Sequence, residues 1–194
     1  PFDFVIEPKG NRYNNTKKVG DKDLIVNAEI FNHQYVNREA VVKSIPTAFE
    51  TDIKPGDTII VHHNVFRRWH NQKGIEKNSR SYFNENTYLV KEDQIFLYKR
   101  DKDWKALNGY CFVQPIKQRK KLGVDTEEYC VGVVKYTDGE YKKEELIGFT
   151  PFSTYEFIID GKRLYRVMTQ FITIKYEYQG DEEEYNPSWA ESCR

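Results

Sequence analysis

The densest group of possible metal ligands in this 194-residue chain is His62-His63-Asn64, which His70 follows. A histidine pair, an asparagine and a later histidine could hold a divalent ion beside a scissile phosphate, as in some nucleases. Two observations argue against such a site. Adjacent histidines on a strand point to opposite faces, and residues 66–78 lack the apolar period of a helix. We therefore predict structural or surface histidines and no metal site.

A cluster of basic and aromatic side chains follows the histidine pair. Its members are Arg67, Arg68, Trp69, Lys73, Lys77 and Arg80. Such a cluster can contact an acidic protein or stack on nucleic acid, and the alternative is a solvated loop. The chain has 30 basic and 30 acidic residues, and nucleic-acid binding usually needs a basic excess. We therefore expect a protein contact patch here, if any, centred on Arg67, Arg68, Trp69, Lys73 and Arg80.

The remaining sequence has few marks of catalysis. The three cysteines, Cys111, Cys130 and Cys193, do not have the spacing of a paired Cys-x-x-Cys metal site, and reduced thiols are expected. No glycine-rich phosphate loop or nucleophile elbow is visible. No apolar run reaches about 18 residues, so no membrane span is expected. We predict a protein that is not an enzyme, has no cofactor and works in the cytoplasm.

The element that organises the first half of the chain is the turn Lys54-Pro55-Gly56-Asp57. Proline presets φ at the first corner of such a turn, and glycine accepts the positive φ of the second. The β-branched run Thr58–Val61 then predicts a buried strand. Further short strands are expected at residues 3–8, 39–45, 88–90 and 94–98. Asp160-Gly161 lies between apolar runs and predicts a hairpin. The fold class is therefore all-β.

Short segments of the first half recur in the second half in the same order. Phe112-Val113-Gln114-Pro115 is similar to residues 4–8, and Gly132–Tyr136 is similar to residues 40–44. The third pair is residues 165–176 with residues 88–99. The charged run at residues 99–103 between the halves predicts a linker or a solvated face. An acidic run at residues 181–184 marks the segment 179–194 as a tail that is frayed or docked, with Trp189 able to pin it.

The order of these features resembles the GroES-like co-chaperonins, which are small β-barrels. The match rests on Val41-Val42, on the Lys-Pro-Gly-Asp turn with the strand that follows it, and on Tyr88-Leu89-Val90 with Ile95-Phe96-Leu97. It implies one GroES-like barrel at residues 1–100 and a second, degenerate barrel at residues 108–178. The Asn- and Tyr-rich composition is similar to that of phage proteins, and the resemblance then implies a phage-encoded co-chaperonin in its bacterial host.

The resemblance also implies a binding site. In that family a mobile loop ends in an apolar tripeptide that docks on a chaperonin ring, and the corresponding residues here are Leu24, Ile25 and Val26 on the polar segment 9–23. The alternative is a short strand of the barrel wall. Three features depart from the family pattern: the roof hairpin is missing, residues 62–86 form a long insert, and the second copy has only Leu122 and Val124 in its loop.

Two functions follow from this reading. The first is a homo-oligomeric co-chaperonin that caps a chaperonin chamber. The second is a structural protein of a virus particle, where the same barrel would contact neighbouring virion subunits as a capsid, decoration, neck or tail component. The long insert, the acidic tail and the degenerate second copy favour the virion role.

Overall fold

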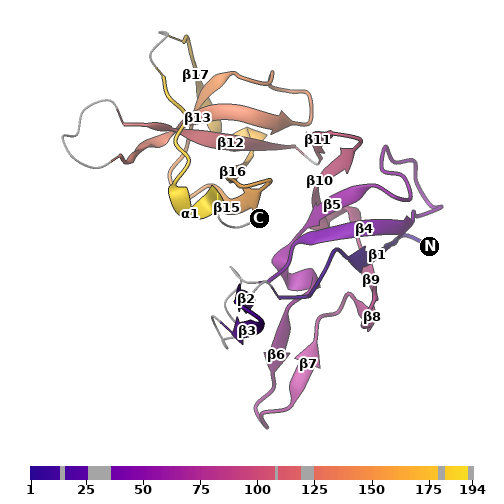
Figure 1. Ribbon diagram of the computed structural model, residues 1–194. Helices are drawn as coiled ribbons and strands as arrows, with labels where there is room; N and C mark the ends of the chain where they lie inside the picture. The colour runs from indigo at the N-terminus through magenta and orange to yellow at the C-terminus, as the bar shows by residue number, and fades with distance from the viewer. Residues whose placement is uncertain (14–15, 26–35, 108, 119–124, 179–181, 192–194) are drawn as a thin grey trace. The chain divides into compact units, whose positions relative to one another are not determined.

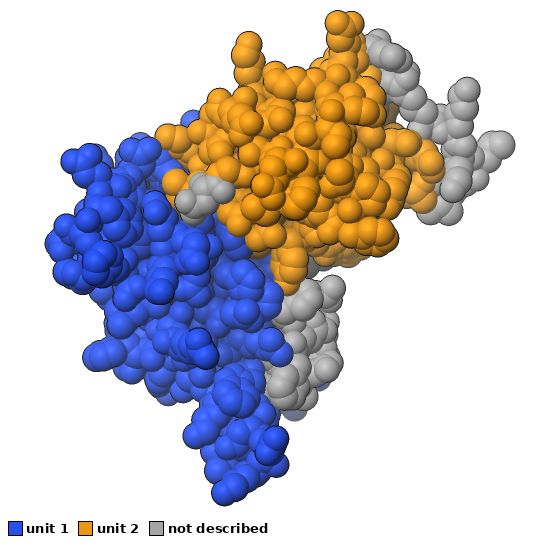
Figure 2. Space-filling view, turned by 180° about the vertical axis from the view of Figure 1, so that it is seen from behind, with its two compact units in different colours: residues 1–104 blue, residues 105–194 orange. Residues whose placement is uncertain are grey.

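The computed structural model describes residues 1–13, 16–25, 36–107, 109–118, 125–178 and 182–191. The chain folds into two compact units, Pro1–Trp104 and Lys105–Arg194 (Figures 1 and 2). Each unit is built on one large antiparallel sheet, so the all-β prediction is confirmed. Among the described residues neither sheet closes into a barrel, because the first and last strands of each sheet are not paired with one another. No described helix is long and apolar enough to cross a membrane.

Unit 1 contains a seven-stranded sheet with the order β11-β10-β5-β4-β1-β9-β8. Its core is formed by large apolar side chains that are fully buried, among them Phe4, Ile6, Ile59 and Leu97. The strands are β1 (Phe4–Pro8), β4 (Glu39–Ser44), β5 (Thr58–Val61), β8 (Tyr82–Asn84), β9 (Thr87–Val90), β10 (Ile95–Arg100) and β11 (Asp103–Ala106).

Two hairpins and two short helices complete unit 1. The hairpins are β2 (Thr16–Val19) with β3 (Lys22–Ile25), and β6 (Arg68–His70) with β7 (Glu76–Asn78). The 3-10 helices are η1 (His63–Val65) and η2 (Glu92–Gln94). The β6–β7 hairpin projects away from the sheet (Figure 1). The insert 62–86 therefore has structure of its own, because it contains η1, the β6–β7 hairpin and β8.

Unit 2 contains a six-stranded sheet with the order β15-β16-β12-β13-β14-β17. Cys111, Val113, Val134, Ile147 and Val167 form part of its buried core. The strands are β12 (Tyr110–Lys117), β13 (Glu127–Thr137), β14 (Leu146–Phe149), β15 (Thr154–Ile159), β16 (Lys162–Met168) and β17 (Ile172–Tyr176), with η3 (Thr169–Phe171) and α1 (Ser188–Glu191).

The two sheets have the same strand order. Six strands of unit 1, β8-β9-β1-β4-β5-β10, correspond in sequence order and position to β15-β16-β12-β13-β14-β17 of unit 2. A 3-10 helix precedes the last strand of each set, η2 before β10 and η3 before β17. The recurring sequence segments lie on corresponding strands of the two sheets.

Two predicted turns are present with the geometry that their residues favour. Gly56 has a φ of +95°, and the amide of Asp57 donates a hydrogen bond to the carbonyl of Lys54 at 3.1 Å. Asp160 and Gly161 have φ values of +50° and +75° between β15 and β16. Both residues of this two-residue loop have the positive φ of a type I′ turn, as the sequence predicted.

Of the two alternatives for residues 99–103, a linker or a solvated face, the structure supports the second, because Asp101, Lys102 and Asp103 are exposed. The charged run lies in the β10–β11 turn, where Asp101 has a φ of +59°. The Nζ atom of Lys99 lies 5.2 Å from the ring centroid of Trp104, which is buried. A charged side chain can lie over an aromatic ring in a folded hairpin, so the charges here accompany a strand rather than a linker.

The tail is docked on unit 2 where the structure describes it, in residues 182–191. Beyond Val113, strand β12 no longer pairs with β16, and the tail occupies that edge. The amide of Lys117 donates to the carbonyl of Glu183 at 2.7 Å, and the amide of Tyr185 donates to the carbonyl of Pro115 at 2.8 Å. Trp189 lies 6.0 Å from the Arg163 guanidinium, so it contacts the body of unit 2.

Candidate functional site

The β2–β3 hairpin carries exposed apolar side chains. Val19, Leu24 and Ile25 are 53%, 54% and 64% exposed. Leu24 and Ile25 are neighbours on one strand, so they point to opposite faces of the two-stranded sheet. Val26, the third residue of the predicted tripeptide, lies outside the described residues. Part of the predicted polar loop, residues 16–19, forms β2 and pairs with β3.

The base of this arm is held firmly although its tip is exposed. The buried side chain of Asn37 donates to the carbonyls of Lys9 at 3.0 Å and Asn11 at 2.9 Å. The amide of Asn37 donates to the carbonyl of Arg12 at 2.9 Å, and Tyr13 forms a β-bridge with Val36. The two stretches of chain on either side of residues 14–35 are therefore joined by hydrogen bonds. We call the described β2–β3 hairpin between them, residues 16–25, the arm.

Arg12 ties the base of the arm to the insert 62–86. Its Nη2 donates to the carbonyl of Phe66 at 3.0 Å, and its Nη1 donates to the Oδ1 of Asn78 at 2.9 Å. Its guanidinium also lies 5.4 Å from the ring centroid of Tyr82 and 5.6 Å from that of Tyr88. No pattern in the sequence identified Arg12, because its partners lie far away along the chain.

Tyr13 makes a second connection of the same kind. Its hydroxyl accepts a hydrogen bond from the amide of Arg68 at 2.7 Å, and the Arg68 guanidinium lies 4.9 Å from its ring centroid. Arg68 also forms an ion pair with Glu76 at 3.3 Å. The insert thus supports the base of the arm, and Arg68 has a structural role there.

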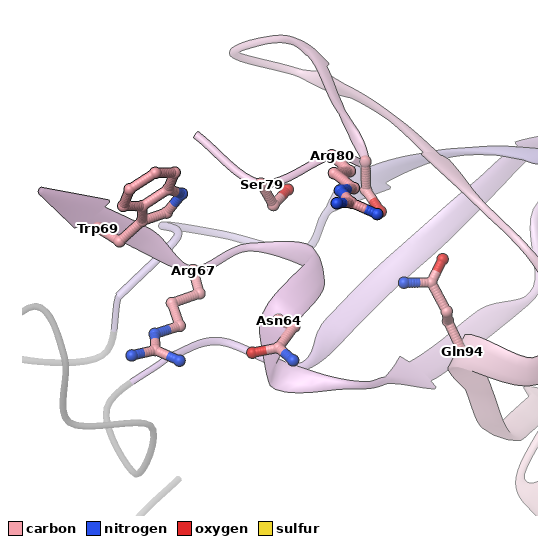
Figure 3. Close-up of a pocket in the computed structure, with 7 residues that line it drawn as sticks. Asn64, Arg67, Trp69, Ser79, Arg80 and Gln94 are labelled. Carbon is pink, nitrogen blue, oxygen red and sulfur yellow. The ribbon is translucent and has the colours of Figure 1, made fainter. Parts of the chain in front are cut away.

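Three residues of the predicted contact patch line one pocket of about 530 Å³ in unit 1. These are Arg67, Trp69 and Arg80, and the other lining residues are Asn64, Ser79, Ser81 and Gln94 (Figure 3). Lys73 lies in the turn of the β6–β7 hairpin, where its amide donates to the Oδ1 of Asn71 at 3.0 Å. Of the five residues predicted to form the contact patch, the structure thus places three around this pocket. The sequence analysis did not identify the polar residues that line the rest of the pocket.

The polar groups of this pocket do not converge on one point. Figure 3 shows Arg80 and Gln94 facing the same opening, whereas the guanidinium of Arg67 points away from that of Arg80. The hydroxyl of Ser79 donates to the carbonyl of Val65 at 2.6 Å, and the Oε1 of Gln94 accepts from the amide of Lys91 at 3.1 Å. An anion clamp needs several donors directed at one place, so this pocket is a poor anion site.

The histidines also take an arrangement that the sequence reasoning missed. His62 and His63 stack on each other, with ring centroids 4.3 Å apart and an angle of 29° between the planes. The argument that they must point to opposite faces was wrong, because β5 ends at Val61 and His62 is the cap of η1. Its Nδ1 accepts a hydrogen bond from the amide of Asn64 at 3.1 Å. In the part of the chain that the structure describes, no group of three or more His, Cys, Asp or Glu side chains is placed to hold a metal ion.

The two described cysteines are both free thiols. Cys111 is buried in unit 2, and burial raises its pKa to about 12. The pKa of Cys130 is also raised, again mainly by burial. A nucleophilic cysteine needs a lowered pKa, so neither thiol has the properties of a catalytic residue. Cys193 lies outside the described residues.

The two candidate surfaces differ in character. The polar groups of the pocket do not converge on one point, whereas the β2–β3 hairpin exposes the apolar side chains of Val19, Leu24 and Ile25. No family model matches the chain, and no curated protein sequence matches it either.

Proposed function

We propose that this protein is a non-enzymatic co-chaperonin of GroES-like type that caps a chaperonin chamber through the arm. The observation that carries the proposal is the exposure of Leu24 and Ile25, at 54% and 64%, on a hairpin whose base is fixed by Asn37. Exposed apolar side chains gathered on one segment are typical of a surface that binds a partner. Under this proposal Leu24, Ile25 and Val26 enter an apolar groove of the chaperonin ring.

The energetics require several copies to act together. Full burial of one such side chain contributes about 1.5–3 kcal/mol, and each backbone residue that becomes ordered costs about 1–2 kcal/mol. The β2–β3 pairing meets part of that ordering cost before binding. One arm still binds weakly, and a homo-oligomeric ring that presents several arms at once gains affinity through multivalency.

The repeated strand order supports the tandem part of the proposal. We infer that each set of six strands is one GroES-like unit, and that only the first unit carries the docking tripeptide. The connection between β1 and β4 spans residues 9–38, whereas the corresponding connection between β12 and β13 spans residues 118–126. The shorter connection leaves less chain for a second arm. We place the protein in the bacterial cytoplasm, where its chaperonin partner would be.

The test is co-sedimentation of the full chain with a double-ring bacterial chaperonin in the presence of ATP. The variant Ile25→Asp removes the exposed apolar side chain and should abolish co-sedimentation. Ile75→Asp is the matched control, because Ile75 is 52% exposed at the turn of a different hairpin, and it should bind like the wild type. Failure of the wild type to co-sediment, or equal binding by both variants, would overturn the proposal.

A second candidate is a structural protein of a virus particle, and one observation favours it. Strand β17 is the last strand of its sheet and exposes Ile174 and Tyr176, which are 49% and 42% exposed. Such an edge suits permanent contact between subunits. The two functions predict different hydrogen exchange in residues 16–25. Exchange should be fast in a free co-chaperonin that has not met its chaperonin, and slow in an assembled particle where the hairpin packs against a neighbouring virion subunit.

A further inference from the structure

Strands β10 and β17 occupy corresponding places in the two sheets, but they differ in how many strands pair with them. In unit 1 strand β10 lies between β5 and β11, and its residues Ile95, Phe96 and Leu97 are at most 2% exposed. In unit 2 the corresponding strand β17 pairs with β14 on one side only, within the described residues. The strand that covers β10 in unit 1 therefore has no counterpart beside β17 in the part of the chain that the structure describes.

Apolar side chains remain exposed along this uncovered strand and at Tyr178, two residues beyond its end. Ile174, Tyr176 and Tyr178 alternate along the chain and are 49%, 42% and 48% exposed. Tyr176 lies over Gly148 on the neighbouring strand, where a Cβ atom would come within 3.0 Å of the tyrosine ring. The glycine thus lets the ring lie close to the sheet. A strand edge with apolar side chains and free backbone groups is a template for pairing with another strand.

We propose that β17 pairs with the β17 strand of a second copy of this chain, antiparallel and about a two-fold axis at Tyr176. The occupant follows from two charges, that of Lys175 on the strand and that of Glu177, the residue directly after the end of the strand. A two-fold axis at Tyr176 places Lys175 opposite Glu177 twice, and it places Ile174 opposite Tyr178 twice. Opposite charges and an aromatic against a β-branched residue are both favourable pairs across a sheet. An axis at Lys175 would instead set two lysines against each other.

The proposed register requires Lys175 and Glu177 to lie on the same face of the sheet. Lys175 already forms an ion pair with Glu145 at 3.5 Å, and its Nζ atom lies 4.7 Å from the ring centroid of Tyr141. These contacts hold the Lys175 side chain on one face of the sheet. Glu177 is two positions further along the chain, so an extended chain places its side chain on the same face. The interface is isologous, since the same strand is used by both copies.

Charge reversal tests this pairing with the full chain and without a chaperonin. Sedimentation velocity of the wild type should show a concentration-dependent dimer. Lys175→Glu and Glu177→Lys should each raise the dissociation constant at least about tenfold, because each places like charges opposite one another. The double variant should restore the wild-type constant. Lys162→Glu, an exposed lysine on β16, is the matched control and should leave dimerisation unchanged.

A covalent test locates the axis. In a chain with Cys130→Ser and Cys193→Ser, the variant Tyr176→Cys should form a disulfide-linked dimer on oxidation, because the two new cysteines would face each other. Tyr178→Cys should not, since its counterpart in the second copy is Ile174. The proposal is overturned if the wild type stays monomeric at roughly 1 mM, a weak-affinity limit, or if the double charge reversal fails to restore the dimer. Co-sedimentation with a chaperonin is a separate measurement, so the two proposals can fail independently.

Discussion

The guanidinium of Arg100 holds the carboxylate of Asp57 at two points, with Nη2 2.8 Å from Oδ2 and Nε 3.2 Å from Oδ1. Asp57 Oδ2 also accepts a hydrogen bond from the amide of Lys54 at 2.8 Å, and the aspartate is buried. One side chain therefore fixes the turn before β5 and joins it to β10. The hydrogen bond to Asp57 raises the pKa of Arg100 above its usual value.

This relationship predicts that substitutions of the two partners lower the free energy of unfolding by unequal amounts. Asp57→Ala should lower the free energy of unfolding by about 1–3 kcal/mol, because the amide of Lys54 and the guanidinium of Arg100 both lose their buried acceptor. Arg100→Ala should lower the free energy of unfolding less. The guanidinium is partly exposed, so water can replace some of the hydrogen bonds that it donates to Asp57. Urea unfolding of the two single variants and the double variant measures the effect. Additive losses in this double-mutant cycle would contradict a direct coupling of the two side chains.

Two tyrosines near Arg12 offer a matched prediction. Tyr88 is fully buried, and its hydroxyl has no hydrogen-bond partner among the described residues. Burial is the main cause of its raised pKa. Tyr88→Phe should therefore leave the free energy of unfolding unchanged or raise it by up to about 1 kcal/mol, whereas Tyr13→Phe should lower it by about 1 kcal/mol, because the amide of Arg68 loses its acceptor. Thermal unfolding of both variants is the measurement, and a larger loss for Tyr88→Phe would refute the assignment.

The docked tail predicts a local change that global unfolding would hide. Asn186 accepts from the amide of Arg163 at 3.0 Å and donates to the carbonyl of Gly161 at 3.1 Å. Asn186→Ala removes both hydrogen bonds and should lower the free energy needed to detach the tail from unit 2 by about 1–2 kcal/mol. Hydrogen exchange of the amides of Tyr185 and Lys117 should then become at least about fivefold faster. Glu183→Gln, at an exposed ion pair with Lys117, should change that exchange much less.

Cys111 predicts a specific loss of stability at alkaline pH. Burial raises its pKa from 9.0 to about 12, so the folded state favours the neutral thiol. Its contribution to stability is complete below pH 9 and is lost as the pH rises toward 12, with a maximum slope of about 1.4 kcal/mol per pH unit. Urea unfolding between these limits should show a shallower pH dependence for Cys111→Ala than for the wild type. In the folded wild type, iodoacetamide at neutral pH should modify Cys130 before Cys111.

Local chemistry explains which parts of this structure the sequence predicts. Gly56 and Gly161 occupy positions that need a positive φ, so their turns are visible in the sequence. Strand β11 was missed because the charged run before it conceals a hairpin, although the alternation from Asp103 to Ala106 is a strand signal. Phe152 could not be predicted in this way. It has a φ of +59°, where glycine or asparagine would be favoured, and its side chain is 99% exposed.

The candidate site was predictable only in its exposed parts. Leu24 and Ile25 stand out because they are apolar residues within a polar segment, and Trp69 stands out among basic residues. Asn37 and Arg12, which hold the base of the arm, carry no such signal. Their roles depend on carbonyl groups that are distant in the sequence and come close only in the folded chain. Periodicity and turn chemistry contain no information about such long-range contacts.

The matching strand order of the two sheets has a consequence for any symmetric assembly of this chain. Every subunit contributes two large sheets whose six common strands have the same order, and the β2–β3 hairpin with the exposed Leu24 and Ile25 belongs to unit 1. In any ring built from this chain, the large sheets would therefore outnumber the copies of this hairpin by two to one.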